Sequence, residues 1–296
     1  MTEVTVVILT MNEELNIRCS IGNVMGWAKE VFVLDSGSTD RTVEIAKEMG
    51  AKTFFRKFDT YAKQRNYAIK ELPIETEWML FLDADEYLTD ELKQEIEDVL
   101  SKNPEENGFY MKRRFYFMGR WIKHGGYYPT ILLRLFKKDF AKVERDINEH
   151  VHVDGKVGFL KHDFADENRK TLSDWIAKHN KYSTFEAIEM INVEKNLTKF
   201  DRKSFFNAPK HEKKKMIMRY IWNKIPPMSR PFLYFTYRYF FKLGFLDGKE
   251  GLIYFMMLCF IMTTATSAKY YELKNREKYL KHGCGSEKSD ISGNEK

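Results

Sequence analysis

Three carboxylates occur within four positions of the sequence, directly after a short apolar run. The run is Trp78-Met79-Leu80-Phe81-Leu82, and Asp83, Asp85 and Glu86 follow it. Such a run predicts a buried strand, and residues two apart in a strand face the same way. Asp83 and Asp85 are therefore expected to converge, as ligands of a divalent cation held against phosphate oxygens do. The alternative is a polar turn in which Glu86 caps the helix that Thr89 begins.

Predicted strands and helices alternate through the first half of the chain. The strands are expected at 4–9, 31–34, 52–55 and 78–82, with helices at 12–24, 41–49 and 60–70. This alternation predicts an α/β fold with a mostly parallel, doubly wound sheet and helices on both faces. Ligands of such sheets bind beyond the carboxyl ends of the strands. That rule brings together three segments that are distant in sequence, 10–13, 35–40 and 83–86.

The second half of the chain has a different pattern. Short strands rich in aromatic and basic residues are expected from 108 to 162, and an amphipathic helix at 171–198. We therefore divide the chain into an α/β domain at 1–165, a helical region at 166–282 and a polar tail at 283–296, which is expected to be disordered. The three cysteines form no metal-binding pattern and leave one unpaired in any disulfide scheme, which favours a reducing, cytoplasmic location.

Polar motifs follow three of the predicted strands. They are Leu-Thr-Met-Asn-Glu-Glu (9–14), Leu-Asp-Ser-Gly-Ser-Thr-Asp (34–40) and Asp-Ala-Asp (83–85). Together, over roughly residues 4–165, they resemble the inverting glycosyltransferases of family 2, which have a GT-A fold. Each motif alone would be weak evidence. The set is specific because every motif occurs at the end of a strand, in the order that the family shows.

Four further stretches are similar to one group within that family, the bacterial lipopolysaccharide inner-core glucosyltransferases. They are Ala-Lys-Gln-Arg-Asn-Tyr-Ala (62–68), Gly-Gly-Tyr-Tyr-Pro (125–129), Leu-Arg-Leu-Phe (133–136) and Gly-Phe-Leu-Asp-Gly (244–248). The resemblance implies transfer of a hexose, glucose from UDP-glucose, onto a lipid-linked saccharide. It also implies Mg²⁺ or Mn²⁺ on the donor diphosphate, where the cation stabilises the leaving group as a Lewis acid. Asp85 would be the direct metal ligand, and Asp83 would contact the ribose or help to hold the metal.

The resemblance also assigns residues to the nucleotide-sugar pocket. They are Thr10, Asn12, Glu13, Asp35, Ser36, Arg65, Asp83 and Asp85. Glu13 would lie near the base or ribose, and Arg65 near the donor phosphates, whose charge a guanidinium neutralises. Ser36 departs from the second Asp of the family's pair, a residue that contacts uracil, so the identity of the base stays open.

An inverting transferase needs a general base that takes the proton of the attacking acceptor hydroxyl. The stretch Asp146-Ile147-Asn148-Glu149-His150 lies where the lipopolysaccharide group shows His-Glu, with Asn148 in place of the histidine. By this resemblance Glu149 is the expected base and Asp146 the alternative. A structural carboxylate is a third interpretation.

Other polar and aromatic residues have two interpretations each. His150 and His152 have the spacing of zinc ligands on one strand face, but two histidines alone are more typical of polar residues near a pocket. His162 matches the Leu-x-His of the lipopolysaccharide group and is a candidate for the metal or phosphate site. Four residues are candidates for stacking on sugar rings or for the core: Trp121, His124, Tyr127 and Tyr128.

Charge is distributed unevenly along the chain. Residues 1–198 carry a net charge of −5, whereas 199–249 hold 13 Lys and Arg against three Asp and Glu, a net of +10. Seven aromatic residues lie within 232–241, and the 18 residues of 251–268 are uncharged. Basic and aromatic residues side by side predict attachment to an anionic membrane surface at the cytoplasmic face of the plasma membrane, peripheral or monotopic. Nucleic acid is disfavoured, because no recognisable nucleic-acid-binding module is present.

The leading hypothesis is thus a membrane-associated, metal-dependent hexosyltransferase. Transfer onto a polyprenyl phosphate, or in capsular or exopolysaccharide synthesis, is the alternative within the same fold. A sugar nucleotidyltransferase is disfavoured, because the first strand lacks the Gly-rich, Arg-containing loop of such enzymes. The alternative from another class is a non-catalytic nucleotide-binding scaffold at the membrane, against which Asp83, Asp85, Arg65 and Glu149 argue.

Overall fold

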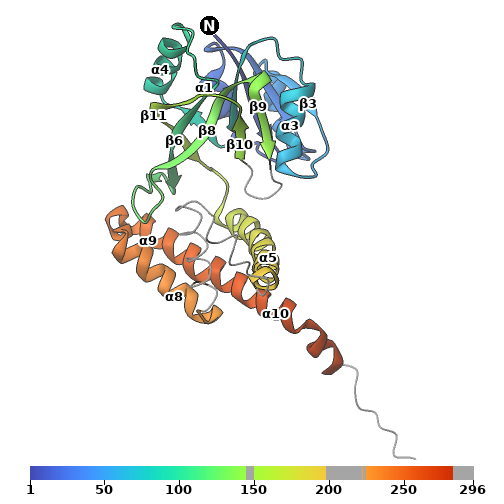
Figure 1. Cartoon of the computed structure of the whole chain (residues 1–296), viewed down its shortest axis with the longest axis vertical. Coiled ribbons are helices and arrows are strands. Elements are labelled where there is room, and N and C mark those ends of the chain that lie inside the picture. Colours follow the sequence, from blue (N-terminus) through green and yellow to red (C-terminus); the bar gives the residue numbers. More distant parts are fainter. Residues whose placement is uncertain (145–149, 198–221, 223–224, 283–296) are drawn as a thin grey trace, which may run out of the picture. The chain divides into compact units, whose positions relative to one another are not determined.

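The computed structural model describes residues 1–144, 150–197, 222 and 225–282 (Figure 1). The chain forms two compact units. The first is Met1–Thr171 together with Arg238–Tyr254, and the second is Leu172–Tyr237 together with Phe255–Lys296. The basic segment 199–221 and the predicted tail 283–296 lie outside the described residues.

A mixed sheet forms the first unit, with strands in the order β3-β2-β1-β4-β8-β6-β11-β5. These strands are β1 (Thr2–Thr10), β2 (Ala28–Asp35), β3 (Lys52–Phe55), β4 (Trp78–Asp83), β5 (Glu86–Leu88), β6 (Gly108–Phe117), β8 (Thr130–Lys137) and β11 (Val157–Glu167), and β7 (Arg120–Trp121) pairs with β6. The strands β1 to β4 are parallel, as the sequence predicts. β8 is antiparallel to β4 and β6, since no crossover helix separates it from β6.

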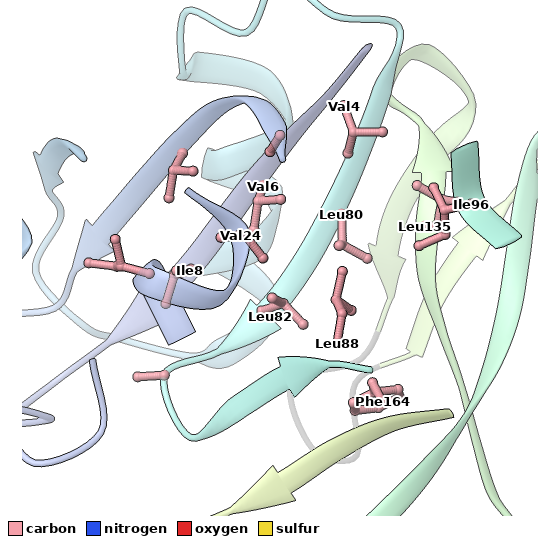
Figure 2. Close-up of a cluster of buried hydrophobic side chains, with 14 of the residues drawn as sticks. Val4, Val6, Ile8, Val24, Leu80, Leu82, Leu88, Ile96, Leu135 and Phe164 are labelled. Atoms are coloured by element: carbon pink, nitrogen blue, oxygen red, sulfur yellow. The ribbon is translucent and has the colours of Figure 1, made fainter. Parts of the chain in front are cut away.

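Two hydrophobic cores cover the two faces of this sheet. Alternate residues of β1 separate them: Val6 belongs to one core and Val7 to the other. The first core, shown in Figure 2, packs α1 (Ile17–Val24), α2 (Thr42–Glu48) and α4 (Asp90–Leu100) on the sheet. The second packs α3 (Tyr61–Glu71) with the hairpin of β9 (Ala141–Glu144) and β10 (His150–Val153). The predicted α/β architecture is confirmed.

The second unit is helical. Its elements are α5 (Leu172–Leu197), η2 (Pro227–Ser229), α8 (Arg230–Phe235), η5 (Met257–Met262) and α10 (Thr263–His282). Helix α5, predicted at 171–198, packs along α10 through polar contacts. Lys269 Nζ donates to the Asn180 carbonyl at 2.5 Å, and Tyr270 donates to Glu194 at 2.7 Å.

One stretch of the described chain, Gly244–Arg276, is long and apolar enough by composition to cross a membrane. One third of its most apolar window is buried within the protein. A buried core helix passes the same test, so the stretch alone is weak evidence for a span.

The segment Arg238–Tyr254 lies between two parts of the second unit in sequence but packs in the first. It contains the end of η3 (Thr236–Phe241), then η4 (Gly244–Asp247) and most of α9 (Gly248–Met256). The domain boundaries predicted from the sequence, 1–165 and 166–282, place this segment in the helical region.

Asp247 attaches this segment to the chain between β7 and β8. Its side chain is 2% exposed and accepts hydrogen bonds from the backbone N–H groups of His124 at 2.9 Å and Lys123 at 3.3 Å. It also pairs with His124 Nδ1 at 2.7 Å. Gly248 has a φ of 70°, and a side chain there would meet the Arg120 guanidinium, which accounts for the Asp-Gly of the 244–248 motif.

Aromatic contacts complete the attachment. The Tyr254 ring lies 5.0 Å from that of Phe115 and 5.1 Å from that of Phe117, and its hydroxyl bonds to that of Tyr127. The Arg238 guanidinium stacks over Tyr127 at 4.9 Å. Tyr127 and His124, considered as sugar-stacking residues, are therefore engaged by the chain itself.

Asp247→Ala should lower the free energy of unfolding by about 2–3 kcal/mol, because it removes the buried carboxylate that accepts the N–H groups of residues 123 and 124 and pairs with the His124 ring. Asp154→Ala is the control, because that side chain is 67% exposed and its pairing with His152 contributes little. Urea unfolding of the full chain measures both. Equal effects of the two substitutions would contradict the assignment.

Candidate active site

The carboxyl ends of β1, β2 and β4 meet at one edge of the sheet. In the strand register Thr10 pairs with Asp35, and Leu9 pairs with Asp83. The structure therefore brings together the three polar segments that the sequence analysis selected.

The loop after β2 is shaped by Asp35, which is 5% exposed. Its carboxylate accepts the N–H groups of Gly37 at 2.8 Å and Ser38 at 2.9 Å. Ser36 accepts a hydrogen bond from Gln64 Nε2 of α3 at 2.9 Å. Both residues are thus held in place by the protein before any ligand arrives.

The loop after β1 is braced against the β2 loop. The N–H of Asn12 donates to Ser38 Oγ at 2.8 Å, and the N–H of Thr39 donates to Asn12 Oδ1 at 2.7 Å. Asn12 has a φ of 55°, a left-handed conformation that asparagine tolerates. For this reason the helix predicted to begin at Asn12 begins only at Ile17.

Thr10 is 5% exposed, and its Oγ1 is buried without a hydrogen-bond partner among the residues described. Buried hydroxyls normally have a partner, and an unsatisfied one is costly. A polar atom left in this state at the sheet edge suits contact with a bound ligand.

Two arginines hold Asp83. Arg65 of α3 donates to Asp83 Oδ1 at 3.2 Å, and Arg134 of β8 donates to Oδ2 at 2.9 Å. Arg134 also donates to Glu86 Oε1 at 2.6 Å. The sequence analysis assigned Arg65 but missed Arg134. The sequence signal that could have identified Arg134 is a cationic residue within the apolar strand Leu-Arg-Leu-Phe. A buried cation requires an anionic partner, so an arginine there is expected to pair with a carboxylate.

Glu86 does not cap the helix after it. It lies in β5, is 1% exposed, and accepts the N–H of Asp83 at 2.9 Å as well as the Arg134 bond. The cap of α4 is Thr89. Burial raises the pKa of Glu86 to about 8, because Arg134 offsets only part of the desolvation and the charges of Asp83 and Asp166 add to it.

Asp85 lies in the turn between β4 and β5. Because β4 ends at Asp83, the expectation that both aspartates share one strand face is wrong. Asp85 Oδ2 accepts a hydrogen bond from Asn168 Nδ2 at 2.9 Å, and its carbonyl accepts the N–H of Glu167 at 2.8 Å. No described residue donates a hydrogen bond to Oδ1. The two aspartates thus differ: Asp83 is ion-paired, and Asp85 has a neutral partner.

Glu13 is close to Asp85. Lys170 Nζ donates to Glu13 Oε1 at 2.5 Å, and Asn16 Nδ2 donates to Oε2 at 2.7 Å. Burial raises the pKa of Glu13; these two hydrogen bonds oppose the shift, and the charge on Asp85 adds to it. Neither Lys170 nor Asn16 was singled out from the sequence.

His152 and His162 each pair with a carboxylate. His162 Nδ1 pairs with Glu95 Oε2 of α4 at 2.9 Å, and His152 pairs with Asp154 at 3.0 Å. Across the described ranges no group of three or more His, Cys, Asp or Glu is arranged to hold a metal ion. The predicted base Glu149 and its alternative Asp146 lie outside the described residues.

Two of the aromatic candidates remain beside charged groups. The Trp121 ring lies 5.0 Å from the Arg114 guanidinium and 5.2 Å from Lys123 Nζ. The Tyr128 hydroxyl donates to the buried Asp163 at 3.2 Å. Stacking of either ring on a sugar stays a prediction.

Residues 5–166 match the family described as Glycosyl transferase family 2. The chain belongs to this family. Among its relatives is an uncharacterised glycosyltransferase of Rickettsia typhi, 29% identical over 212 residues that cover 68% of this chain and 72% of the relative. The lipopolysaccharide core biosynthesis glycosyltransferase LpsC of Rhizobium meliloti is 28% identical, over 62% of this chain and 70% of LpsC.

Solved structures are also similar to this chain. Residues 1–349 of S. aureus TarS are 14% identical, with a TM-score of 0.42 over 93% of this chain and 92% of that one. Glucosyl-3-phosphoglycerate synthase of Mycobacterium tuberculosis, in complex with Mn²⁺, UDP and glucosyl-3-phosphoglycerate, is 20% identical, with a TM-score of 0.31 over 38% of this chain and 44% of that one. The family membership and the mixed sheet agree with the GT-A fold predicted from the sequence.

The pKa of Glu86 makes stability depend on pH. Between 4.5, its ordinary pKa, and about 8 the folded state holds a proton that the unfolded chain has lost. The free energy of unfolding of the wild type should therefore fall with rising pH relative to that of Glu86→Gln, by at most about 1.4 kcal/mol per pH unit. Urea unfolding of both proteins across this range measures the difference. A difference that does not change with pH would disprove the protonated state.

Proposed function

We propose that this glycosyltransferase moves a hexose, glucose from UDP-glucose, onto a lipid-linked saccharide such as the inner core of a lipopolysaccharide, with inversion at the sugar. The observation that carries the proposal is the state of Asp85 at the edge of the sheet. No described residue donates a hydrogen bond to one of its carboxylate oxygens, whereas the neighbouring Asp83 is ion-paired. Family membership supports the transfer chemistry. The likeness to LpsC supports the class of acceptor.

The donor set at the edge fits Mg²⁺ or Mn²⁺. Hard divalent cations in such enzymes are held by one or two carboxylates together with substrate phosphates and water. Asp85 is the carboxylate suited to this, because Asp83 already accepts hydrogen bonds from two arginines through its two oxygens. When bound, the cation supplies Lewis-acid stabilisation of the diphosphate leaving group.

The charged cluster beside Asp85 suits an anionic donor. Arg65 and Arg134 both pair with Asp83, and burial raises the pKa of Glu86. The two guanidinium groups therefore place positive charge near Asp85, where it would stabilise a diphosphate. Thr10 Oγ1, the fixed Asp35–Ser36 turn, Asn12 and Glu13 would orient the nucleoside, and Asp83 the ribose.

Inversion requires a base on the acceptor side. We assign this role to Glu149, with Asp146 as the alternative, from the family resemblance of residues 146–150. The base would take the proton of the acceptor hydroxyl while the diphosphate leaves, so the sugar changes configuration in one displacement.

The membrane assignment gains support from exposed apolar residues of the first unit. Within its returning segment, Phe241 is 76% exposed, and the other large exposed apolar residues are Phe240, Leu243, Phe245, Leu246 and Ile253. Soluble surfaces rarely gather apolar residues so densely, and Lys242 lies among them. We infer that the exposed apolar side chains of this returning segment insert into the interface of an anionic membrane at the cytoplasmic face. Lys210, Lys213, Lys214 and Lys215, assigned the same role, lie outside the described residues.

Asp85→Asn should lower metal-dependent hexose transfer at least about a hundredfold while leaving the fold intact, because an amide replaces the carboxylate that binds the cation. The assay follows transfer from UDP-glucose with MnCl₂ at increasing concentration. Asp90→Asn is the control, because that side chain is 98% exposed in the same acidic stretch. Near-normal activity of Asp85→Asn at saturating Mn²⁺ would reject the site.

Phe241→Ser combined with Leu246→Ser should weaken binding to anionic vesicles about tenfold, since partial insertion of two such side chains contributes about 1–2 kcal/mol. Flotation with phosphatidylglycerol vesicles at low and high salt measures it. The matched control is Phe55→Ser, whose side chain is 68% exposed at the opposite edge strand β3. A wild-type protein that stays wholly in the detergent-free supernatant would refute membrane attachment.

A further inference from the structure

The segment Glu167–Lys170, which begins with the last residue of β11, binds back onto the turn that carries Asp85. The N–H of Glu167 donates to the Asp85 carbonyl at 2.8 Å, and Asn168 Nδ2 donates to Asp85 Oδ2 at 2.9 Å. Both the backbone and the side chain of Asp85 are therefore held by this segment. All of these residues belong to the first unit.

The orientation of the Asn168 amide follows from its other partners. Its Oδ1 accepts the N–H of Lys170 at 2.9 Å and Asn16 Nδ2 at 3.3 Å. A rotated amide would place its NH₂ group against the Lys170 N–H and its oxygen against the Asp85 carboxylate, which is unfavourable on both sides. The nitrogen of Asn168 is thus committed to donating to Asp85.

Asn16 is the anchor of this arrangement. It is 1% exposed, and its Oδ1 accepts the N–H of Arg169 at 2.9 Å. Its Nδ2 donates to both Asn168 and Glu13. Because an unmade bond at a buried amide is costly, Asn16 resists any shift of the segment.

The partner of Asp85 is neutral, unlike the partners of Asp83. An arginine or lysine would neutralise the carboxylate and compete with a cation for it. An amide N–H fixes one oxygen, leaves the negative charge in place and leaves Oδ1 to a ligand. Hydrogen-bond donors of this kind orient metal ligands, and their loss costs about 10–100-fold in metal affinity.

We propose that Asn168 is a positioning residue for the donor-metal site, which holds Asp85 for the cation–diphosphate pair and is itself held by Asn16. The proposal rests on the proposed function of Asp85. Asn168 acts on the cation through Asp85 and need not touch the donor.

The test is titration calorimetry of MnCl₂ into the full chain with UDP present, which needs no turnover. Asn168→Ala should weaken Mn²⁺ binding about 10–100-fold. In the transfer assay it should raise the Mn²⁺ concentration needed for half-maximal rate by a similar factor, while the rate at saturating Mn²⁺ stays within about threefold of wild type. A purely structural role would lower the rate at every concentration.

The matched control is Asn23→Ala. Asn23 of α1 also holds the chain after Asp85, through two hydrogen bonds at 2.8 and 3.0 Å, but both of them go to the Leu88 backbone and not to Asp85. Thermal unfolding without metal checks that both variants fold. If Asn23→Ala weakens Mn²⁺ binding as much as Asn168→Ala, general loosening explains the effect and the proposal fails.

Asp85→Asn separates this proposal from the proposed function. If Asp85→Asn binds Mn²⁺ and UDP as tightly as wild type, Asp85 is not the ligand and both proposals are overturned. If Asp85→Asn loses binding while Asn168→Ala retains it, only the role of Asn168 is overturned. Loss in both, with Asn23→Ala near wild type, supports the assignment.

Discussion

The buried cation of Arg134 is the constraint on which the rest of the site depends. A guanidinium away from water needs a negative charge and hydrogen-bond acceptors, and here Asp83 supplies the charge while Glu86 supplies a second acceptor oxygen. Removing one partner of such a cluster costs about 3–5 kcal/mol, because the remaining charge is left uncompensated. Strand β8 must therefore lie beside β4, and the chain after Asp83 must turn back at once so that Glu86 reaches the same guanidinium. Asp85 is half-buried in the turn that results.

This arrangement divides electrostatic roles among three carboxyl groups close in sequence. Asp83 is paired with arginines, burial raises the pKa of Glu86, and the described side-chain partner of Asp85 is the neutral amide of Asn168. Under the proposed function, a cation would therefore bind at one defined oxygen atom instead of being shared among several. The surrounding arginines meanwhile favour the phosphates that would accompany it.

Local signals were enough to predict the first part of the fold. Apolar runs gave β1 and β4, the alternation of elements gave α3, Thr89 gave the start of α4, and the rule for strand ends grouped Thr10, Asp35 and Asp83. The failures were at positions where a distant partner decides. Asn16 and Asn168 are 152 residues apart, and His124 and Asp247 are 123 apart. Such pairs leave no periodicity or spacing that the sequence could reveal. The same is true of the side-chain hydrogen bonds in the loop before α1, because of which this helix begins only at Ile17.

The return of Arg238–Tyr254 to the first unit has a consequence for synthesis on the ribosome. Phe115 and Phe117 are made early, but Tyr254, which packs against both rings, is translated more than a hundred residues later. Domains generally fold in the order in which they emerge. The first unit cannot complete its folding until the apolar stretch that follows residue 244 has begun to emerge from the ribosomal exit tunnel. The first unit therefore completes its folding only when the segment that we assign to the membrane emerges from the ribosome.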